Sequence, residues 1–307
     1  MSSVRSLPRT GRSFSTSLPE LPEVETVRTS LAPILIGRTF ERVEIRDGRL
    51  TRPLDPMVVA AELEGERVAA VERRGKYLVL RLDTGRALVV HLRMTGSFRG
   101  EETPHTRAVI TLDDETRILY RDVRRFGTWL LLEPGEVDAY LDARLGPEPL
   151  GRGFGPRALA AALEKRRAPV KAALLDQRTV AGLGNIYVDE ALWRARIHPL
   201  RPAESLDADE VVRLHRAIRA ALRMGIARQG ATLRDYAQPD GSRGGMQHEF
   251  KVYGRGGEPC DRCGTPIEKT RAGGRGTWFC PSCQPFYAAR SASSSSRPSR
   301  SSRQSSV

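Results

Sequence analysis

The stretch CDRCGTPIEKTRAGGRGTWFCPSC, residues 260–283, holds all four cysteines of the chain and indicates a metal-binding hairpin. Cys260 and Cys263 form one Cys-x2-Cys pair, Cys280 and Cys283 form a second, and sixteen residues separate the pairs. Two such pairs supply the four thiolates of a tetrahedral zinc site, and this spacing is specific. Because sulfur fills every coordination position, water and substrate have no place on the metal. We therefore predict one zinc ion with a structural role.

Three basic residues lie between the cysteine pairs: Lys269, Arg271 and Arg275. Gly273 and Gly274 give this turn conformational freedom. A basic hairpin tip of this kind can contact the phosphates of a nucleic acid. A zinc ribbon with ordinary solvated charges is the alternative from these residues alone.

The whole chain is basic, with 50 Lys and Arg against 37 Asp and Glu in 307 residues and a net charge of +13. Seven arginines lie near the two ends, and without them residues 19–287 keep a charge of +6. The surplus favours a polyanionic partner such as nucleic acid, although a solvated basic surface also explains it. No apolar run reaches the roughly 18 residues of a membrane span. The clustered cysteines leave none for disulfides elsewhere, which indicates a reducing compartment.

Both ends have the composition of disordered segments. Residues 291–307 are almost entirely Ser and Arg, and residues 1–17 are also rich in both and lack acids. Such sequences cannot bury enough apolar surface to fold. The first segment also has a composition found in organelle transit peptides. We expect disordered extensions over residues 1–18 and 288–307.

The first half of the ordered chain begins with a helix pattern and continues with strand patterns. From Glu23 onward, Val24, Val27 and Leu31 recur at helical spacing. Short runs rich in Val, Leu and Ile, separated by turn residues, then predict strands at 40–45, 68–71, 77–82, 87–92, 108–112, 118–120 and 129–132. Their even spacing favours an antiparallel sandwich or barrel.

The second half has helical periodicity. The predicted helices are 159–167, 171–176, 186–195 and 207–228. The last is the clearest, because Val211, Leu214 and Ile218 keep the helical period, and Asp207 with Glu210 forms a capping-box pattern. An α+β multidomain fold follows, with a β domain before a helical one.

Seven short motifs resemble, in their shared order, those of the formamidopyrimidine-DNA glycosylase family. They are PELPEVET at 19–26, RGKYL at 74–78, HLRMTGS at 91–97, DVRRFG at 122–127, LGPEPL at 145–150, GLGNIY at 182–187 and VYGR at 252–255, and the zinc hairpin follows them. The resemblance implies an N-terminal helix plus antiparallel β-sandwich, then a helical helix-two-turn-helix domain with a C-terminal zinc-finger hairpin whose ligands are the four cysteines. The implied boundaries are 19–135 for the catalytic sandwich domain, 136–155 for a linker, 156–240 for the helical domain, and 241–287 for a lesion loop and the zinc hairpin.

The resemblance also implies a bifunctional DNA glycosylase and AP lyase. Such an enzyme removes oxidised purines, namely 8-oxoguanine and formamidopyrimidines, from duplex DNA in base excision repair. The secondary amine of Pro19 would attack the sugar and form a Schiff base, and β,δ-elimination would follow. Glu20 would move protons, and Lys76 would act near the lesion's phosphate and in elimination. From residue type alone, Pro19 and Glu20 would begin a helix, and Lys76 would be a surface lysine.

Met94, Arg124 and Phe126 match the residues with which the family fills the space that a flipped base leaves. An apolar side chain can wedge between base steps while a guanidinium binds the orphaned base. Without the resemblance, Met94 and Phe126 would be assigned to a core. The same two motifs imply DNA contacts by His91 and Arg125.

Three further residues match DNA-contacting positions of the family. Asn185 lies in the implied helix-two-turn-helix turn, where a helix start offers free N–H donors, although a simple helix cap is the alternative. Lys171 resembles a lysine that contacts a phosphate or the lesion. Arg275 holds the place of the hairpin's phosphate-binding arginine and is also expected in the catalytic site.

Two positions depart from the family's pattern. Arg93 replaces a small residue before the wedge methionine, and Met246 stands where an aromatic residue is common. Met246 lies in the segment 240–247, which corresponds to the loop over the flipped base. The preference among 8-oxoguanine, ring-opened purines and oxidised pyrimidines therefore stays open.

The largest departure concerns Pro19, because eighteen residues precede it. In the family, the initiator methionine precedes the catalytic proline and is removed. A prolyl amide nitrogen is no nucleophile, since its lone pair is delocalised into the carbonyl. Translation from Leu18 followed by trimming, or cleavage of a leader, would each free the amine. If Pro19 stays blocked, the chain is instead a non-catalytic protein that binds damaged DNA.

A third interpretation, a zinc-ribbon transcription or replication factor, explains neither PELPEVET nor the turn at Arg124, Arg125 and Phe126. We therefore expect double-stranded DNA with damaged bases as the partner, no membrane, and a monomer. The expected location is the bacterial cytoplasm, in association with the nucleoid.

Overall fold

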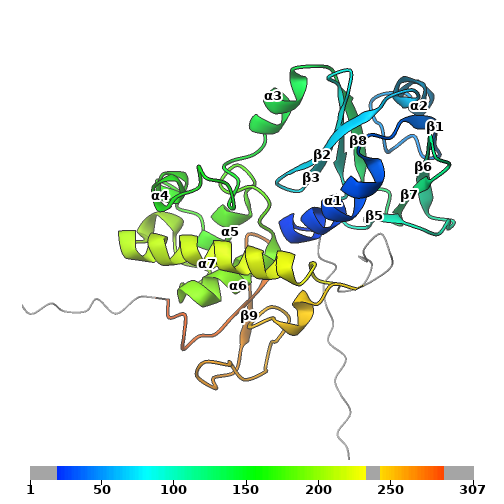
Figure 1. Ribbon diagram of the computed structural model, residues 1–307. Helices are drawn as coiled ribbons and strands as arrows, with labels where there is room; N and C mark the ends of the chain where they lie inside the picture. Colours follow the sequence, from blue (N-terminus) through cyan, green and yellow to red (C-terminus); the bar gives the residue numbers. More distant parts are fainter. Residues whose placement is uncertain (1–18, 233–242, 287–307) are drawn as a thin grey trace, which may run out of the picture.

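The computed structural model describes residues 19–232 and 243–286, and it shows a β-sandwich, a helical domain and a two-stranded hairpin (Figure 1). The expected extensions at 1–18 and 288–307 lie outside the described residues, as do residues 240–242 of the expected lesion loop. No helix in the described part of the chain combines the length and apolar character that crossing a membrane requires.

Two four-stranded antiparallel sheets form the first domain, with the strand orders β1-β6-β7-β5 and β2-β3-β4-β8. The strands are β1 (Phe40–Ile45), β2 (Val68–Arg74), β3 (Tyr77–Leu82), β4 (Ala87–His91), β5 (Gly96–Arg99), β6 (Thr106–Leu112), β7 (Arg117–Asp122) and β8 (Thr128–Leu132). Seven of them lie where the sequence predicts strands. The short β5 was not predicted, because it begins with glycine and has no run of β-branched residues.

The apolar faces of the two sheets pack against each other and against two helices. Leu80 of one sheet and Ile110 of the other belong to the same buried core. Helix α1 (Leu21–Leu35) and helix α2 (Pro56–Leu63) add side chains to this core, Leu63 among them. Helix α2 was not predicted, because only two of its eight residues are buried and its apolar spacing is correspondingly weak.

The segment 136–155, expected to be a linker, begins instead with helix α3 (Glu136–Asp142). Val137 and Leu141 lie one helical turn apart and pack with Val79 on the outer face of the second sheet. This contact explains why the central strand β4 is buried along its whole length. The remainder of the segment, rich in Pro and Gly, connects the two domains.

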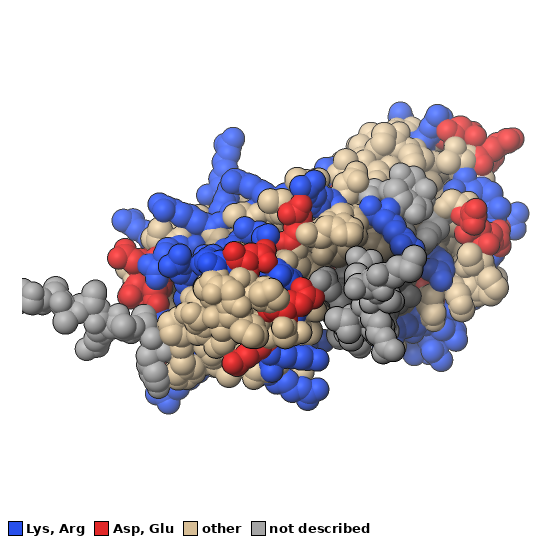
Figure 2. Space-filling view, turned by 90° about the horizontal axis from the view of Figure 1, so that it is seen from below, with Lys and Arg blue, Asp and Glu red and all other residues tan. Residues whose placement is uncertain are grey.

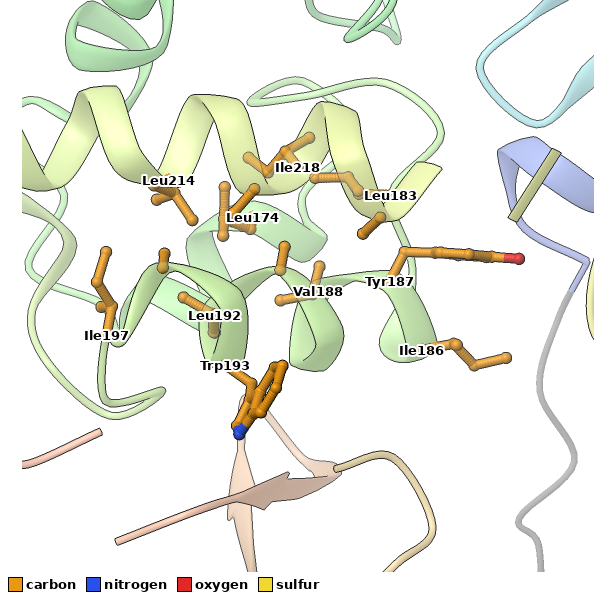
Figure 3. Close-up of a cluster of buried hydrophobic side chains, with 14 of the residues drawn as sticks. Leu174, Leu183, Ile186, Tyr187, Val188, Leu192, Trp193, Ile197, Leu214 and Ile218 are labelled. Atoms are coloured by element: carbon orange, nitrogen blue, oxygen red, sulfur yellow. The ribbon is translucent and has the colours of Figure 1, made fainter. Parts of the chain in front are cut away.

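The helical domain consists of α4 (Pro156–Leu163), α5 (Val170–Leu175), α6 (Asn185–Ala195) and α7 (Ala208–Ala227), with short 3-10 turns η1 (Ala203–Ser205) and η2 (Met246–His248). Leu192 of α6 faces Leu214 and Ile218 of α7 in a common core (Figure 3). The predicted capping box of α7 is confirmed. The Asp207 carboxylate accepts a hydrogen bond from the Glu210 N–H at 2.8 Å, and the Glu210 carboxylate accepts one from the Asp207 N–H at 3.1 Å.

The zinc hairpin pairs β9 (Glu268–Ala272) with β10 (Arg275–Phe279), and Arg275 lies opposite Ala272. It packs beside α6, as Figure 1 indicates. Trp193 projects from α6 toward these strands in Figure 3, and its indole N–H donates to the Cys260 sulfur at 3.4 Å.

Helix α1 contributes to both cores. Leu21 packs in the core of the helical domain, whereas Val24 and Val27 pack in the core of the sandwich. Figure 1 accordingly shows α1 between the two domains. The first turn of α1 therefore lies at the domain boundary, directly after Pro19 and Glu20.

Candidate active site

Glu20 connects the start of α1 to the start of α6. Its side chain is buried and accepts hydrogen bonds from the backbone N–H groups of Ile186 at 2.9 Å and Tyr187 at 3.3 Å. These are free donors of the first turn of α6. Gly184 permits this approach, because a Cβ atom there would lie 2.3 Å from the Glu20 carboxyl carbon. Pro19, the residue before it, is also buried.

Burial raises the pKa of Glu20 to about 7, and the nearby Glu23 carboxylate acts in the same direction. The positive charge of Lys76 and the two N–H donors of α6 oppose this rise. A carboxyl group with such a pKa holds and releases a proton near neutral pH. The structure thus gives Glu20 the property that its predicted proton-transfer role needs.

Lys76 lies in the same group of charges. Burial lowers the pKa of its amine, the carboxylates of Glu20 and Glu23 raise it, and the positive charge of Arg275 lowers it further. Lys76 is therefore within electrostatic reach of Glu20, Glu23 and Arg275. The structure therefore brings three of the predicted catalytic residues together, next to Pro19.

The turn that carries Lys76 is held by the segment between the domains. The backbone N–H of Gly75 donates to the Glu148 carboxylate, and Arg73 donates to the same carboxylate at 3.0 Å. Arg73 also donates to Glu25 of α1 at 2.9 Å. Gly75 has a φ of +57°, a conformation that favours glycine. Glu148 lies in the LGPEPL motif, for which no function was predicted from the sequence.

The predicted wedge residues lie on two loops that Asp122 joins. Its buried carboxylate accepts hydrogen bonds from the Thr95 hydroxyl and from the Gly127 N–H, the latter at 2.7 Å. Thr95 follows Met94, and its hydroxyl also accepts a bond from the Arg124 N–H at 3.0 Å. Asp122 thus sets the Met94 loop against the loop of Arg124.

At the outer end of these loops, Phe126 is 49% exposed, which is unusual for a large apolar side chain. The Arg124 guanidinium lies over its ring, 4.9 Å from the centroid. Arg124 is itself exposed, and Met94 is half-buried. An exposed aromatic ring beside an arginine has the chemistry of a wedge with a base-binding neighbour.

Arg125 has a different environment from its neighbours. Its guanidinium forms a two-point ion pair with the buried Asp47 carboxylate, one of whose bonds measures 2.8 Å. This ion pair restrains Arg125, whose backbone φ is +60°. The ion pair gives Arg125 a role in shaping the loop of Arg124 and Phe126, while its side chain stays 41% exposed and its DNA contact stays a prediction.

His91 ends β4 and is nearly buried. Its Nδ1 accepts a hydrogen bond from the Arg93 N–H at 3.0 Å, and Tyr77 packs edge-on against its ring. Burial, followed by the charges of Arg93 and Lys76, lowers the pKa of His91 to about 3. The ring is therefore neutral at physiological pH.

Lys171 and Asn185, two predicted DNA contacts, meet at one carbonyl of the zinc hairpin. The Gly276 carbonyl accepts hydrogen bonds from the Lys171 ammonium at 2.9 Å and from the Asn185 amide at 3.0 Å. Lys171 is completely buried and ion-paired at 2.7 Å with Asp189, a residue that the sequence interpretation missed. Arg275, next to Gly276, is exposed.

Glu23 was also missed, although it lies within PELPEVET. Its buried carboxylate accepts hydrogen bonds from the Tyr187 hydroxyl at 2.9 Å, the Ala231 N–H at 2.8 Å and the Glu20 N–H at 2.9 Å. Its position three residues after a helix-starting acid was the available signal, because this is the capping-box spacing. Glu23 therefore joins α1 and α6 to the end of α7.

The four cysteines are arranged as a zinc site requires. Their sulfur atoms all lie within 4.8 Å of one another, and the Cys263–Cys280 and Cys260–Cys283 separations are 3.4 and 3.9 Å. Tetrahedral Zn–S bonds of about 2.3 Å place sulfurs about 3.8 Å apart, so the arrangement fits a single ion.

Three family models match the chain in order. The formamidopyrimidine-DNA glycosylase N-terminal domain matches residues 18–129, the formamidopyrimidine-DNA glycosylase H2TH domain matches 145–237, and the zinc finger found in FPG and IleRS matches 257–285. A formamidopyrimidine-DNA glycosylase of Geobacillus kaustophilus is 48% identical over 274 residues, covering 87% of this chain and 100% of the relative. The chain belongs to the formamidopyrimidine-DNA glycosylase family. The family and the enzyme class predicted from the motifs are confirmed.

Solved structures of formamidopyrimidine-DNA glycosylases share the fold. The complex between Lactococcus lactis Fpg and DNA containing an abasic site has a TM-score of 0.81 and 39% identity, covering 87% of this chain and 99% of that one. A structure of MutM in complex with carbocyclic 8-oxo-G containing DNA has the same TM-score and identity, covering 87% and 100%. The predicted α+β fold and the single structural zinc ion of this family are thereby confirmed.

Proposed function

We propose that this chain is a bifunctional DNA glycosylase and AP lyase that excises oxidised purines through a Schiff base on the amine of Pro19. The observation that carries the proposal is the environment of Glu20, whose pKa of about 7 makes it a proton donor directly beside Pro19. Lys76 and Arg275 belong to the same group of charges. Family membership supplies the reaction class.

In the proposed reaction, the Pro19 nitrogen forms a bond to C1′ of the damaged nucleotide, and the bond between C1′ and the base breaks. The Pro19 nitrogen gives up its proton in this step, and the base takes up one proton as it leaves. Glu20 protonates the sugar ring oxygen, so that the ring opens and an iminium ion remains on Pro19. Loss of a C2′ proton then expels the 3′ phosphate by β-elimination. A second, δ-elimination expels the 5′ phosphate, and water hydrolyses the iminium ion and restores the amine.

The proposed substrate is duplex DNA with 8-oxoguanine or a formamidopyrimidine. Solved relatives were crystallised with abasic-site DNA and with 8-oxo-G DNA, which supports the substrate class. Met94, Arg124 and Phe126 would fill the space left by the flipped base. Lys and Arg side chains are widespread on the face in Figure 2, as contact with phosphates requires. We propose that the protein acts on chromosomal DNA as a monomer.

The chemistry requires a free amine on Pro19, since an amide nitrogen cannot attack the sugar. Borohydride trapping on an 8-oxoguanine duplex tests this requirement, because it reduces the Schiff base to a stable covalent adduct. A protein that begins at Pro19 should give the adduct. The same protein with one alanine added before Pro19 should give almost none.

Pro19→Gly is the matched variant, because glycine at the first position still offers a primary amine. It should retain part of the adduct. Equal trapping by the protein that begins at Pro19 and by its alanine-extended form would exclude Pro19 as the nucleophile. Absence of any adduct from the protein that begins at Pro19, with damaged-duplex binding intact, would identify a non-catalytic DNA-binding protein.

A further inference from the structure

We infer that Asp189 is a positioning residue for Arg275, because it fixes the strand of the zinc hairpin on which Arg275 lies. The inference rests on the proposed function, in which Arg275 binds a DNA phosphate at the active site. Asp189 itself lies in α6 and is only 1% exposed, so it does not contact DNA directly.

Asp189 holds strand β10 through its own carboxylate. One carboxylate oxygen accepts a hydrogen bond from the Trp278 backbone N–H at 3.1 Å. The other lies 2.7 Å from the Lys171 ammonium, and both side chains of this ion pair are completely buried. A carboxylate therefore reaches the hairpin backbone across the interface between α6 and β10.

Lys171 binds the hairpin backbone at Gly276, the residue that follows Arg275. Its ammonium donates to the Gly276 carbonyl at 2.9 Å, and Asn185 donates to the same oxygen at 3.0 Å. The backbone on the carboxyl side of Arg275 is therefore held by one charged donor and one neutral donor, and Trp278 is held by Asp189 itself.

The charge of Asp189 is needed because Lys171 is buried. A buried ammonium without a counter-charge is strongly disfavoured, so it loses its proton or moves toward water. Either response would weaken its bond to Gly276. Gly273, Gly274 and Arg275 of the hairpin tip are exposed, and Gly273 packs against Ala172 of α5 without a side chain of its own to anchor it. Replacing Asp189 should therefore change the position of the Arg275 guanidinium.

A direct DNA contact by Lys171 is the competing assignment. The Lys171 ammonium already has a carboxylate and a carbonyl as partners, and no part of its side chain is exposed. If Lys171 positions the hairpin and does not contact DNA itself, removing the Asp189 charge should remove the phosphate contact of Arg275 and leave the other DNA contacts intact.

The test is a double-mutant cycle with a duplex that carries a tetrahydrofuran abasic-site analogue, measured by fluorescence anisotropy between about 50 and 200 mM salt. Arg275→Ala should reduce the slope of log K against log salt by about 0.9, the value for one phosphate. Asp189→Asn should reduce it by a similar amount. In the Arg275→Ala background, Asp189→Asn should change Kd by less than about twofold. Losses that multiply in the double variant would overturn the inference.

Glu210→Gln is the matched control, since it breaks another buried ion pair of the same domain, between Glu210 and Arg201, which does not touch the hairpin. It should lower the melting temperature as Asp189→Asn does, and leave the salt slope unchanged. An equal loss of slope in Glu210→Gln would assign the effect to general destabilisation and overturn the inference.

The pair variant Lys171→Gln with Asp189→Asn covers the case in which Asp189→Asn alone does not fold or hold zinc. It removes both charges and keeps amide groups that can bond to Gly276 and Trp278. It should bind one zinc per chain and show a salt slope between those of the parent and of Arg275→Ala. When Arg275→Ala is added to this pair variant, the fold losses in DNA affinity should not multiply. If they multiply, the inference is overturned. If the inference fails in this way but the parent protein still gives a normal borohydride adduct, the proposed function is not contradicted.

Discussion

The hydroxyl of Tyr187 donates a hydrogen bond of 2.9 Å to the carboxylate of Glu23, and this bond ties the start of α6 to the first turn of α1. Both side chains are buried, and burial raises the pKa of Glu23. Gly225 of α7 makes room for the ring, because a Cβ atom there would lie 2.4 Å from it. Tyr187 therefore extends from α6 toward α1, as Figure 3 shows.

Tyr187→Phe should lower the free energy of unfolding by about 1–3 kcal/mol, because it leaves a buried carboxylate with one donor fewer. Urea unfolding followed by circular dichroism measures the change. Tyr140→Phe is the control, since that half-buried ring packs under the Arg144 guanidinium, a contact that phenylalanine retains. A loss as large at Tyr140 as at Tyr187 would count against the role of the buried bond.

The excision step should depend on the protonated form of Glu20. Glu20, with a pKa of about 7, must be protonated, whereas the amine of Pro19 must be unprotonated, and an α-amino group ordinarily has a pKa of about 8. The single-turnover rate on 8-oxoguanine DNA should therefore be highest between about pH 7 and pH 8 and fall on both sides, on the alkaline side through loss of the Glu20 proton. Glu20→Gln should lower the rate about 10²–10⁴-fold and flatten this profile. Glu41→Gln, on the exposed side of β1, should keep the parent profile. A parent rate that is constant from about pH 6 to pH 9 would exclude Glu20 as the acid.

His91 should make stability depend on pH. Its pKa is about 3 in the folded protein and 6.5 in the unfolded chain, so only the unfolded chain gains a proton between these values. Stability should therefore fall by about 1.4 kcal/mol for each pH unit below 6.5. Between pH 7 and pH 5, the parent should lose about 2 kcal/mol more than His91→Gln, measured by urea unfolding. His248→Gln, at an exposed site, should behave as the parent, and the same response from both variants would refute the assignment.

Phe126→Ala should change stability by less than about 0.5 kcal/mol, because the ring is exposed. If the ring fills the space of the flipped base, affinity for the tetrahydrofuran duplex should fall far more than affinity for undamaged duplex. Met57→Ala removes an even more exposed apolar side chain, on α2, and should alter neither affinity. Equal losses on both duplexes for Phe126→Ala would show a nonspecific contact instead of a wedge.

Local sequence patterns predicted the features that local chemistry determines. The cysteine spacing gave the zinc site, Asp207 with Glu210 gave the capping box, and the strand patterns gave seven strands. Contacts between residues far apart in the chain could not be predicted in this way. Asp189 lies 89 positions from Trp278, and Glu23 lies 208 positions from Ala231. Arg125 illustrates the same limit, since its ion-pair partner Asp47 is 78 positions away.

The sharing of α1 between two cores has a consequence for how the molecule loses activity on denaturation. Leu21 packs in one core and Val24 in the other. Unfolding of either domain therefore removes packing contacts from the first turn of α1, directly after Pro19 and Glu20. Unfolding of the two domains should therefore be a single cooperative event. The fraction of molecules able to form the Schiff base should follow the same denaturation curve as the global fold, with no partly unfolded species that still reacts.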